Sequence, residues 1–120
     1  MTERGRVVAV GHVGLNVRDL EGLARFYRET ISLKQTVYVP NTVAIFEVGE
    51  VDVFLAPGEP GAADFDLSVD DVDAFRARLV SAKVVCTEPT DSKVTGHRGF
   101  MFTDPDGNTV RVTSAHPRAR

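Results

Sequence analysis

Hydrophobic and polar positions along the chain follow the same order twice, with a shift of 52 residues between the two copies. Each copy opens with apolar residues at every second position, which is typical of a strand with one buried face. The apolar spacing then changes to three and four residues, which predicts an amphipathic helix. Asp19 and Asp71 stand at the two junctions, and we expect each of them to cap the helix that follows.

Short strand-like runs follow each predicted helix and are separated by turn residues. These runs cover residues 35–39, 43–48 and 51–56 in the first half and residues 83–87, 99–103 and 109–113 in the second. The predicted order is therefore βαβββ in each half. We expect one α+β domain whose parts are a first module at 7–56, a connector rich in proline and glycine at 57–61, a second module at 62–114 and a tail at 115–120.

Composition and charge narrow the classes of function. The chain has 120 residues, of which 42% are hydrophobic, and this is enough for one core. Its 14 basic and 17 acidic residues give a net charge of −3 without a basic run, which argues against a nucleic-acid partner. No apolar stretch approaches the roughly 20 residues that span a bilayer, so we expect no membrane partner and a cytoplasmic location. The single cysteine, Cys86, is expected to be a buried hydrophobe.

Several motifs in this order resemble one known family. They are the repeated βαβββ pattern, the opening Gly-His-Val-Gly-Leu-Asn-Val-Arg-Asp-Leu at 11–20, the Phe-Tyr pair at 26–27 and Phe-Thr-Asp-Pro-Asp-Gly-Asn at 102–108. Together they resemble the vicinal oxygen chelate superfamily, also called the glyoxalase, bleomycin-resistance and extradiol dioxygenase superfamily, over residues 8–114. The resemblance implies two paired modules whose sheets curl around a cavity, with helices on the convex side. It also implies a homodimer.

The resemblance further implies where metal-dependent members hold a divalent ion, namely at one position on the first strand and one on the last strand of each module. The first-strand positions are His12 and Asp64, and the last-strand position of the second module is Arg111. In the first module the last-strand position falls on Phe54, or on Asp52 if the strand is shifted by two residues. Phenylalanine has no donor atom and arginine repels a cation, so we expect neither a metal nor another cofactor.

Strand alternation independently assigns the residues of the inner faces. The side chains on these faces are mostly polar and small, which is typical of a pocket wall for a small molecule. The expected ligand contacts are His12, Asn16, Phe54, Asp64, Asp66 and Arg111. We expect Arg111 to pair with Asp64 or Asp66, because an unpaired buried guanidinium is costly. The acidic inner face and the net charge favour a cationic or amine-bearing ligand.

Two histidines outside the predicted strands receive no catalytic role. His97, together with Arg98, precedes the strand at 99–103 and is expected in solvent or at the entrance of the cavity. His116 belongs to the tail, which is expected to be disordered.

The favoured interpretation is a metal-independent small-molecule-binding protein that sequesters a drug or metabolite, as the bleomycin-resistance type does. The alternative is a metal-dependent glyoxalase-like lyase, epimerase or dioxygenase, with its metal held by His12, Asp52, Asp64 and a fourth group. A third interpretation is a metal-free catalyst in which His12 and a carboxylate act as general base. In a fourth interpretation, Phe54 and an Arg111 ion pair close the cavity, and the chain serves as an oligomerisation module.

Overall fold

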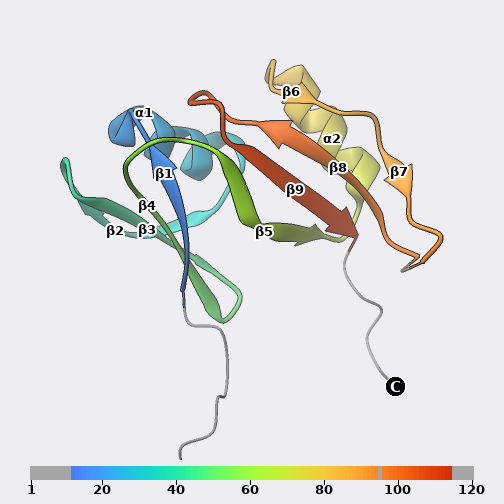
Figure 1. Ribbon diagram of the computed structural model, residues 1–120, viewed down its shortest axis with the longest axis horizontal. Coiled ribbons are helices and arrows are strands. Elements are labelled where there is room, and N and C mark those ends of the chain that lie inside the picture. The colour runs from blue at the N-terminus through green and yellow to red at the C-terminus, as the bar shows by residue number, and fades with distance from the viewer. Residues whose placement is uncertain (1–11, 95, 115–120) are drawn as a thin grey trace, which may run out of the picture.

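The computed structural model describes residues 12–94 and 96–114, and its first module forms a sheet with the strand order β1-β4-β3-β2 (Figure 1). β1 (His12–Val17) pairs in parallel with β4 (Val51–Pro57). β3 (Val43–Val48) pairs with β4 in antiparallel fashion, and β2 (Lys34–Val39) forms the outer edge. The connection from β1 to β4 therefore passes through a helical segment and two strands, β2 and β3.

The second module repeats this arrangement with a broken edge strand. β5 (Ala62–Val69) pairs in parallel with β9 (Thr109–Ser114), which pairs in antiparallel fashion with β8 (Arg98–Thr103). Two short strands, β6 (Val85–Cys86) and β7 (Thr90–Asp91), pair with different parts of β8. The two parallel pairs, β1 with β4 and β5 with β9, are equivalent in the repeat.

Each module carries one helical segment after its first strand. α1 (Leu20–Arg25) continues directly into the π-helical turn η1 (Phe26–Thr30), and α2 (Val72–Ser81) covers the second sheet. Asp19 and Asp71 each accept a hydrogen bond at 3.0 Å from the backbone N–H three residues on, so the predicted caps are confirmed. Among the described residues, no helix has the length and apolar character needed to cross a bilayer.

The core lies between the helices and the convex faces of the sheets. Figure 1 shows the modules side by side, with α1 and α2 along the same edge of the view. The largest fully buried apolar side chains come from both modules, and they are Tyr27, Phe46, Phe102, Leu23, Leu55, Leu79, Val17, Val110 and Val112. The element order and the two sheets confirm the predicted α+β class with two modules.

The edge strand of the second module differs from the prediction. We expected one strand at 83–87, but only Val85 and Cys86 pair with β8 there. The reason is local: Lys83 has a left-handed backbone, with φ of 66°, and the Val84 N–H still donates to a carbonyl of α2. The chain is therefore still leaving the helix where the strand was expected. The predicted start of the first strand at residue 7 and the tail at 115–120 lie outside the described residues.

The Asp-Pro-Asp-Gly-Asn turn at 104–108 joins the two modules through buried polar contacts, and we call this set of contacts the interlock. The Tyr27 hydroxyl donates to Asp104 at 2.9 Å. The Asn108 amide donates to the Asn16 carbonyl at 2.9 Å and to Asp104 at 3.1 Å, and its oxygen accepts from the Gly61 N–H at 2.8 Å. Asp104 is 3% exposed and Asn108 fully buried, so these bonds are shielded from water.

Asp106 extends the interlock to the start of α1. Its carboxylate accepts from the backbone N–H groups of Arg18 and Asp19, the latter at 2.9 Å. A negative charge is favourable at a helix N-terminus. Burial and the neighbouring Asp104 carboxylate raise the pKa of Tyr27 far above its ordinary value, so this phenol remains a donor. The interlock thus fixes how the two inner faces sit relative to each other.

Candidate functional site

A polar pocket of about 380 Å³ lies on the inner face of the second sheet. Side chains of β5 and β9 form its floor, namely Asp66, Ser68, Arg111 and Thr113. Its wall comes from β7, the turn after it and the start of β8, with Thr90, Ser92, His97 and Gly99. Hydroxyl groups therefore make up half of the lining residues, and a hydroxyl can both donate and accept a hydrogen bond.

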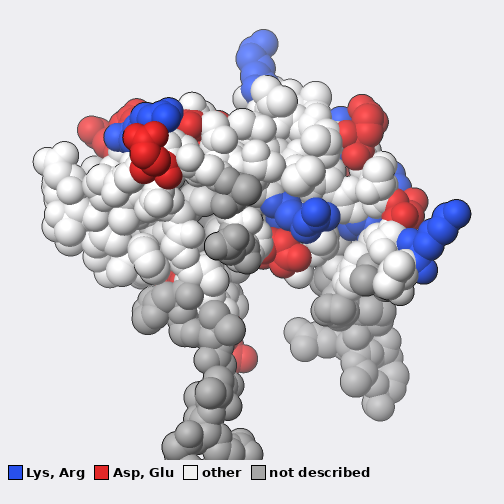
Figure 2. Space-filling model, viewed as in Figure 1, with Lys and Arg blue, Asp and Glu red and all other residues white. Residues whose placement is uncertain are grey.

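Arg111 and Asp66 lie next to each other on this floor. They are register partners in the parallel β5–β9 pair, and both side chains are exposed. Figure 2 shows basic and acidic side chains side by side over β9 and β5. The expected ion pair between Arg111 and Asp66 does not form, and no described carboxylate pairs with Arg111. The exposure of Arg111 explains this, since a solvated guanidinium needs no partner. The side chain of the other expected partner, Asp64, lies outside the described residues.

His97 contributes to the pocket although the sequence indicated only a loop or an entrance position. Its Nδ1 lies 2.8 Å from the Ser114 carbonyl oxygen. A carbonyl can only accept, so Nδ1 carries the proton in the neutral ring and Nε2 is the acceptor nitrogen. Strand alternation could not place His97, because the residue precedes β8 and its orientation depends on the contact with Ser114 at the end of β9.

The inner face of the first sheet is occupied by an aromatic ring. A Cβ at Gly14 would lie 2.7 Å from Cζ of Phe54, so the Phe54 ring lies directly over the glycine. Gly14 and Phe54 are register partners, as Asp66 and Arg111 are in the second module. Because Gly14 and Asp66 are equivalent in the repeat, this register makes Phe54, rather than Asp52, the counterpart of Arg111.

The predicted contacts whose side chains the structure describes do not all line one pocket. Asp66 and Arg111 line the polar pocket, whereas Phe54 and Asn16 lie on the first sheet and are not among its lining residues. His12 lies in β1, and its side chain, like that of Asp64, is outside the described part. Between the sheets runs an apolar groove of about 660 Å³, lined from β1, β4 and β5 by Val13, Val51, Val53, Phe65 and Leu67 among others.

The positions at which metal-dependent members of the resembled superfamily hold an ion do not fit one here. Phe54 offers no donor atom, and Arg111 carries a permanent positive charge where a ligand would have to be an anion or a neutral donor. Within residues 12–94 and 96–114, no three described His, Cys, Asp or Glu side chains come together as a metal-binding group. Two of the four metal positions therefore supply no ligand.

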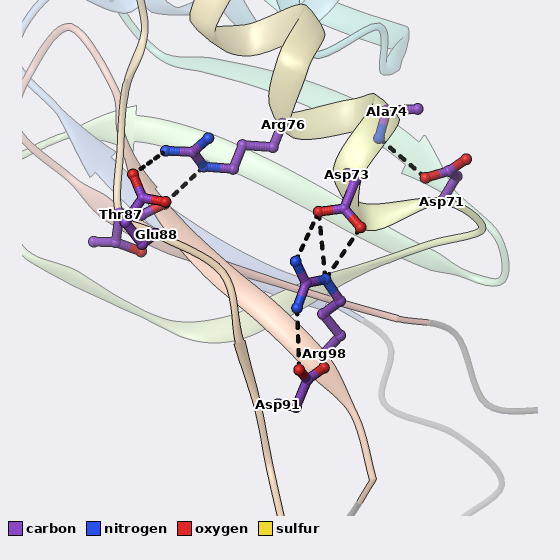
Figure 3. A network of polar contacts seen from close by, with 8 residues as sticks. All are labelled: Asp71, Asp73, Ala74, Arg76, Thr87, Glu88, Asp91 and Arg98. Atoms are coloured by element: carbon purple, nitrogen blue, oxygen red, sulfur yellow. Dashed lines mark hydrogen bonds and ion pairs between the residues drawn. The ribbon is translucent and has the colours of Figure 1, made fainter.

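Arg98 and Arg76 fasten the wall of the pocket to α2 (Figure 3). The Arg98 guanidinium donates to both oxygens of Asp73, at 2.9 and 3.1 Å, and to Asp91 of β7 at 3.1 Å. Arg76 donates to the Thr87 carbonyl at 2.8 Å and pairs with Glu88 at 3.2 Å. The Arg98 hydrogen bonds lower the pKa of Asp73. Arg98 thus links a helix, a short strand and the pocket wall.

Replacing Arg98 with glutamine is expected to loosen this wall. β7 has only two residues, so its pairing with β8 is short and the Arg98 contacts add to it. We expect faster amide hydrogen exchange at Thr90 and Asp91, with the exchange of buried β9 amides unchanged. Lys93→Gln, which removes a charge without an ion pair among the described residues, is the matched control. Equal exchange rates in the Arg98 variant and the unmodified protein would contradict this role.

The Arg98 contact should also depend on pH. The pKa of Asp73 is lower in the folded chain than in the unfolded chain. The stabilisation from the Arg98–Asp73 contact is therefore fully present above the unfolded-state pKa of Asp73, and it is lost as the pH falls through the folded-state pKa. The difference in exchange between the Arg98 variant and the unmodified chain is therefore expected at neutral pH and should shrink under acidic conditions, after correction for intrinsic exchange rates.

Solved structures share this architecture. A superfamily member from Sphaerobacter thermophilus has a TM-score of 0.80 and 22% identity, covering 91% of this chain and 98% of its own. A lactoylglutathione lyase from Agrobacterium tumefaciens has a TM-score of 0.79 and 21% identity, covering 92% and 96%. An antibiotic-binding protein from Streptomyces sp. CB03234 has a TM-score of 0.79 and 25% identity, covering 92% and 98%. No curated protein matches the chain.

The family itself is shown by the sequence match. A model described as the Glyoxalase/Bleomycin resistance protein/Dioxygenase superfamily matches residues 9–112, which span both modules and the connector. The match includes the inner-face strands and the interlock turn, so it covers the features that build the site. The chain therefore belongs to the Glyoxalase/Bleomycin resistance protein/Dioxygenase superfamily.

Proposed function

We propose that this chain is a metal-independent binding protein that holds a small drug or metabolite on the inner faces of its sheets. The observation that carries the proposal is the pair of residues at the last-strand positions. The Arg111 guanidinium at the position in the second module repels a metal ion, and the Phe54 ring at the position in the first module has no atom that can coordinate one. Both side chains are well suited to direct contact with an organic ligand, one through a planar cation and the other through a ring face.

The size and lining of the pocket support the same function. At about 380 Å³ it lies within the range of small-molecule sites, roughly 300–1,000 Å³. Its hydroxyl groups and the Arg111 guanidinium provide directional contacts, and the neighbouring apolar groove shares Asp66 and Ser68 with it. The likeness to the Streptomyces antibiotic-binding protein is in keeping with a binding role.

A thermal-shift panel of drugs and metabolites tests the proposal. A compound that binds the folded chain and is present at 100 times its Kd stabilises it by about 2.7 kcal/mol. We expect at least one compound to raise Tm saturably, and we expect Arg111→Gln to reduce that shift. Arg25→Gln, which removes an exposed arginine of α1, is the matched control and should leave the shift intact. A panel in which no compound raises Tm would count against the binding function.

Metal analysis separates this function from the enzymatic alternative. Protein purified without a chelator or an affinity tag is expected to contain no stoichiometric Zn, Ni, Fe or Mn. A stoichiometric content of any of these would instead favour a glyoxalase-like lyase, epimerase or dioxygenase.

The homodimer stays a prediction, and light scattering of the purified protein tests it.

A further inference from the structure

The side chains of Arg111 and Asp66 form an oppositely charged pair whose members do not satisfy each other. They are neighbours across the β5–β9 pair and both line the polar pocket. Neither side chain has a hydrogen-bond or ion-pair partner among the described residues. Opposite charges on adjacent strands ordinarily attract each other, so their separation leaves both groups available to a third charged partner.

Arg111 differs in this respect from the other arginines that the structure describes. Five of them pair with a carboxylate: Arg18, Arg25, Arg28, Arg76 and Arg98. Arg78 instead donates to the Ile31 carbonyl and lies over the Phe75 ring. Among the described arginines, Arg111 alone makes no such contact, and its side chain lines the polar pocket. Its planar fork is suited to a carboxylate or a similar oxyanion, which it can bind through two parallel hydrogen bonds.

Asp66 restricts which oxyanions this pocket can accept. A ligand that carries only a negative charge is attracted by Arg111 and repelled by Asp66, whereas a simple amine meets the opposite pair of forces. A zwitterion is attracted by both groups, provided that its charges can reach two neighbouring strands about 4.8 Å apart. The hydroxyls of Ser68 and Thr113 flank the two charged residues and can complement either end of such a ligand.

We infer that the pocket of the second module binds the two charged groups of a small zwitterion, with the carboxylate or other oxyanion at Arg111 and the ammonium group at Asp66. This inference rests on the proposed binding function and specifies its ligand class. It also refines the ligand class expected from the sequence: the amine remains, but the inner face also contains the unpaired Arg111 guanidinium, which favours a ligand with a negative group as well.

The test compares three probes of nearly equal shape: 4-aminobutyrate, butyrate and n-butylamine. Each is titrated into ¹⁵N-labelled protein while the amide signals of Asp66, Ser68, Arg111 and Thr113 are followed. We expect 4-aminobutyrate to shift these signals saturably and to bind on the order of tenfold more tightly than either singly charged probe, because it gains a second charge-assisted contact. The preference should weaken as salt is added.

Two variants assign the two contacts. Arg111→Gln should abolish the preference for 4-aminobutyrate over n-butylamine, and Asp66→Asn should abolish the preference over butyrate. Arg25→Gln and Asp70→Asn remove equal charges from exposed positions outside the pocket and should leave both preferences unchanged. Retained ¹⁵N spectra in all four variants show that the fold is intact.

The inference is overturned if butyrate or n-butylamine binds as tightly as 4-aminobutyrate, or if 4-aminobutyrate causes no saturable shift at the four amides. If a compound of the thermal-shift panel nevertheless binds the inner faces, the binding function stands and only the ligand class is wrong. If neither the probes nor the panel bind, the binding function fails as well.

Discussion

Replacing Asn108 with alanine is expected to lower the free energy of unfolding by about 2–4 kcal/mol. The side chain makes three hydrogen bonds, to the Asn16 carbonyl, the Gly61 N–H and Asp104, and it is fully buried. Alanine would leave these partners without a bond in a place that water does not reach easily, which is the costly case. Urea denaturation followed by circular dichroism measures the change, with an unchanged m-value if the fold is kept.

Asn41→Gly is the matched control for this experiment. Asn41 occupies an exposed turn with φ of 61°, where glycine is tolerated, so its loss should change stability by less than about 0.5 kcal/mol. An Asn108 variant as stable as this control would show that the interlock does not hold the modules together. The Tyr27→Phe variant should fall between the two, because it removes only the bond to Asp104.

The interlock also shows how far the sequence could predict this molecule. Apolar periodicity and the repeat predicted both modules, and Asp19 and Asp71 were correctly expected as caps, because these features depend on residues close in the chain. The role of Asn108 depends on contact with Asn16, 92 residues away, and no local pattern encodes such a contact. The sequence suggested only that the turn reverses the chain.

The inner faces were predicted in composition but not in their contacts. Alternation correctly placed Asp66 and Arg111 on one face, because the side-chain period of a strand is two. It could not predict that Arg111 leaves Asp66 unpaired, since this depends on the paths of two flexible side chains. Nor could it predict that His97 joins the pocket, because residues before a strand have no fixed period.

The two modules use one backbone register for different chemistry. Gly14 with Phe54 and Asp66 with Arg111 occupy equivalent places, yet one pair is a ring over a glycine and the other a pair of charges. A ligand that contacted both faces would therefore meet an apolar surface on one side and a polar one on the other. This asymmetry is compatible with binding, whereas a metal centre built from both modules would require donors at both places.

Exchanging Phe54 and Arg111 for glutamate is therefore expected to raise the metal affinity well above that of the natural chain. By sequence, His12 and Asp64 take the two first-strand positions of the family's metal site, and Phe54→Glu with Arg111→Glu would supply the other two. Four such donors satisfy Zn²⁺ or Ni²⁺, and the exchange also removes a repelling cation. Calorimetric titration should show saturable binding at micromolar concentrations in the double variant and none in the natural chain.

Stability provides a second readout of the same exchange. The double variant loses the ring that covers Gly14 and gains a carboxylate beside Asp66, so without metal it should melt below the natural chain. Added Zn²⁺ should reverse this loss, because metal that binds only the folded state stabilises it. Phe54→Gln with Arg111→Gln keeps similar side-chain lengths without adding carboxylates and should gain far less. If the natural chain bound the ion as tightly as the double variant, Phe54 and Arg111 would not be what excludes a metal, and the proposed metal-independent function would lose its basis.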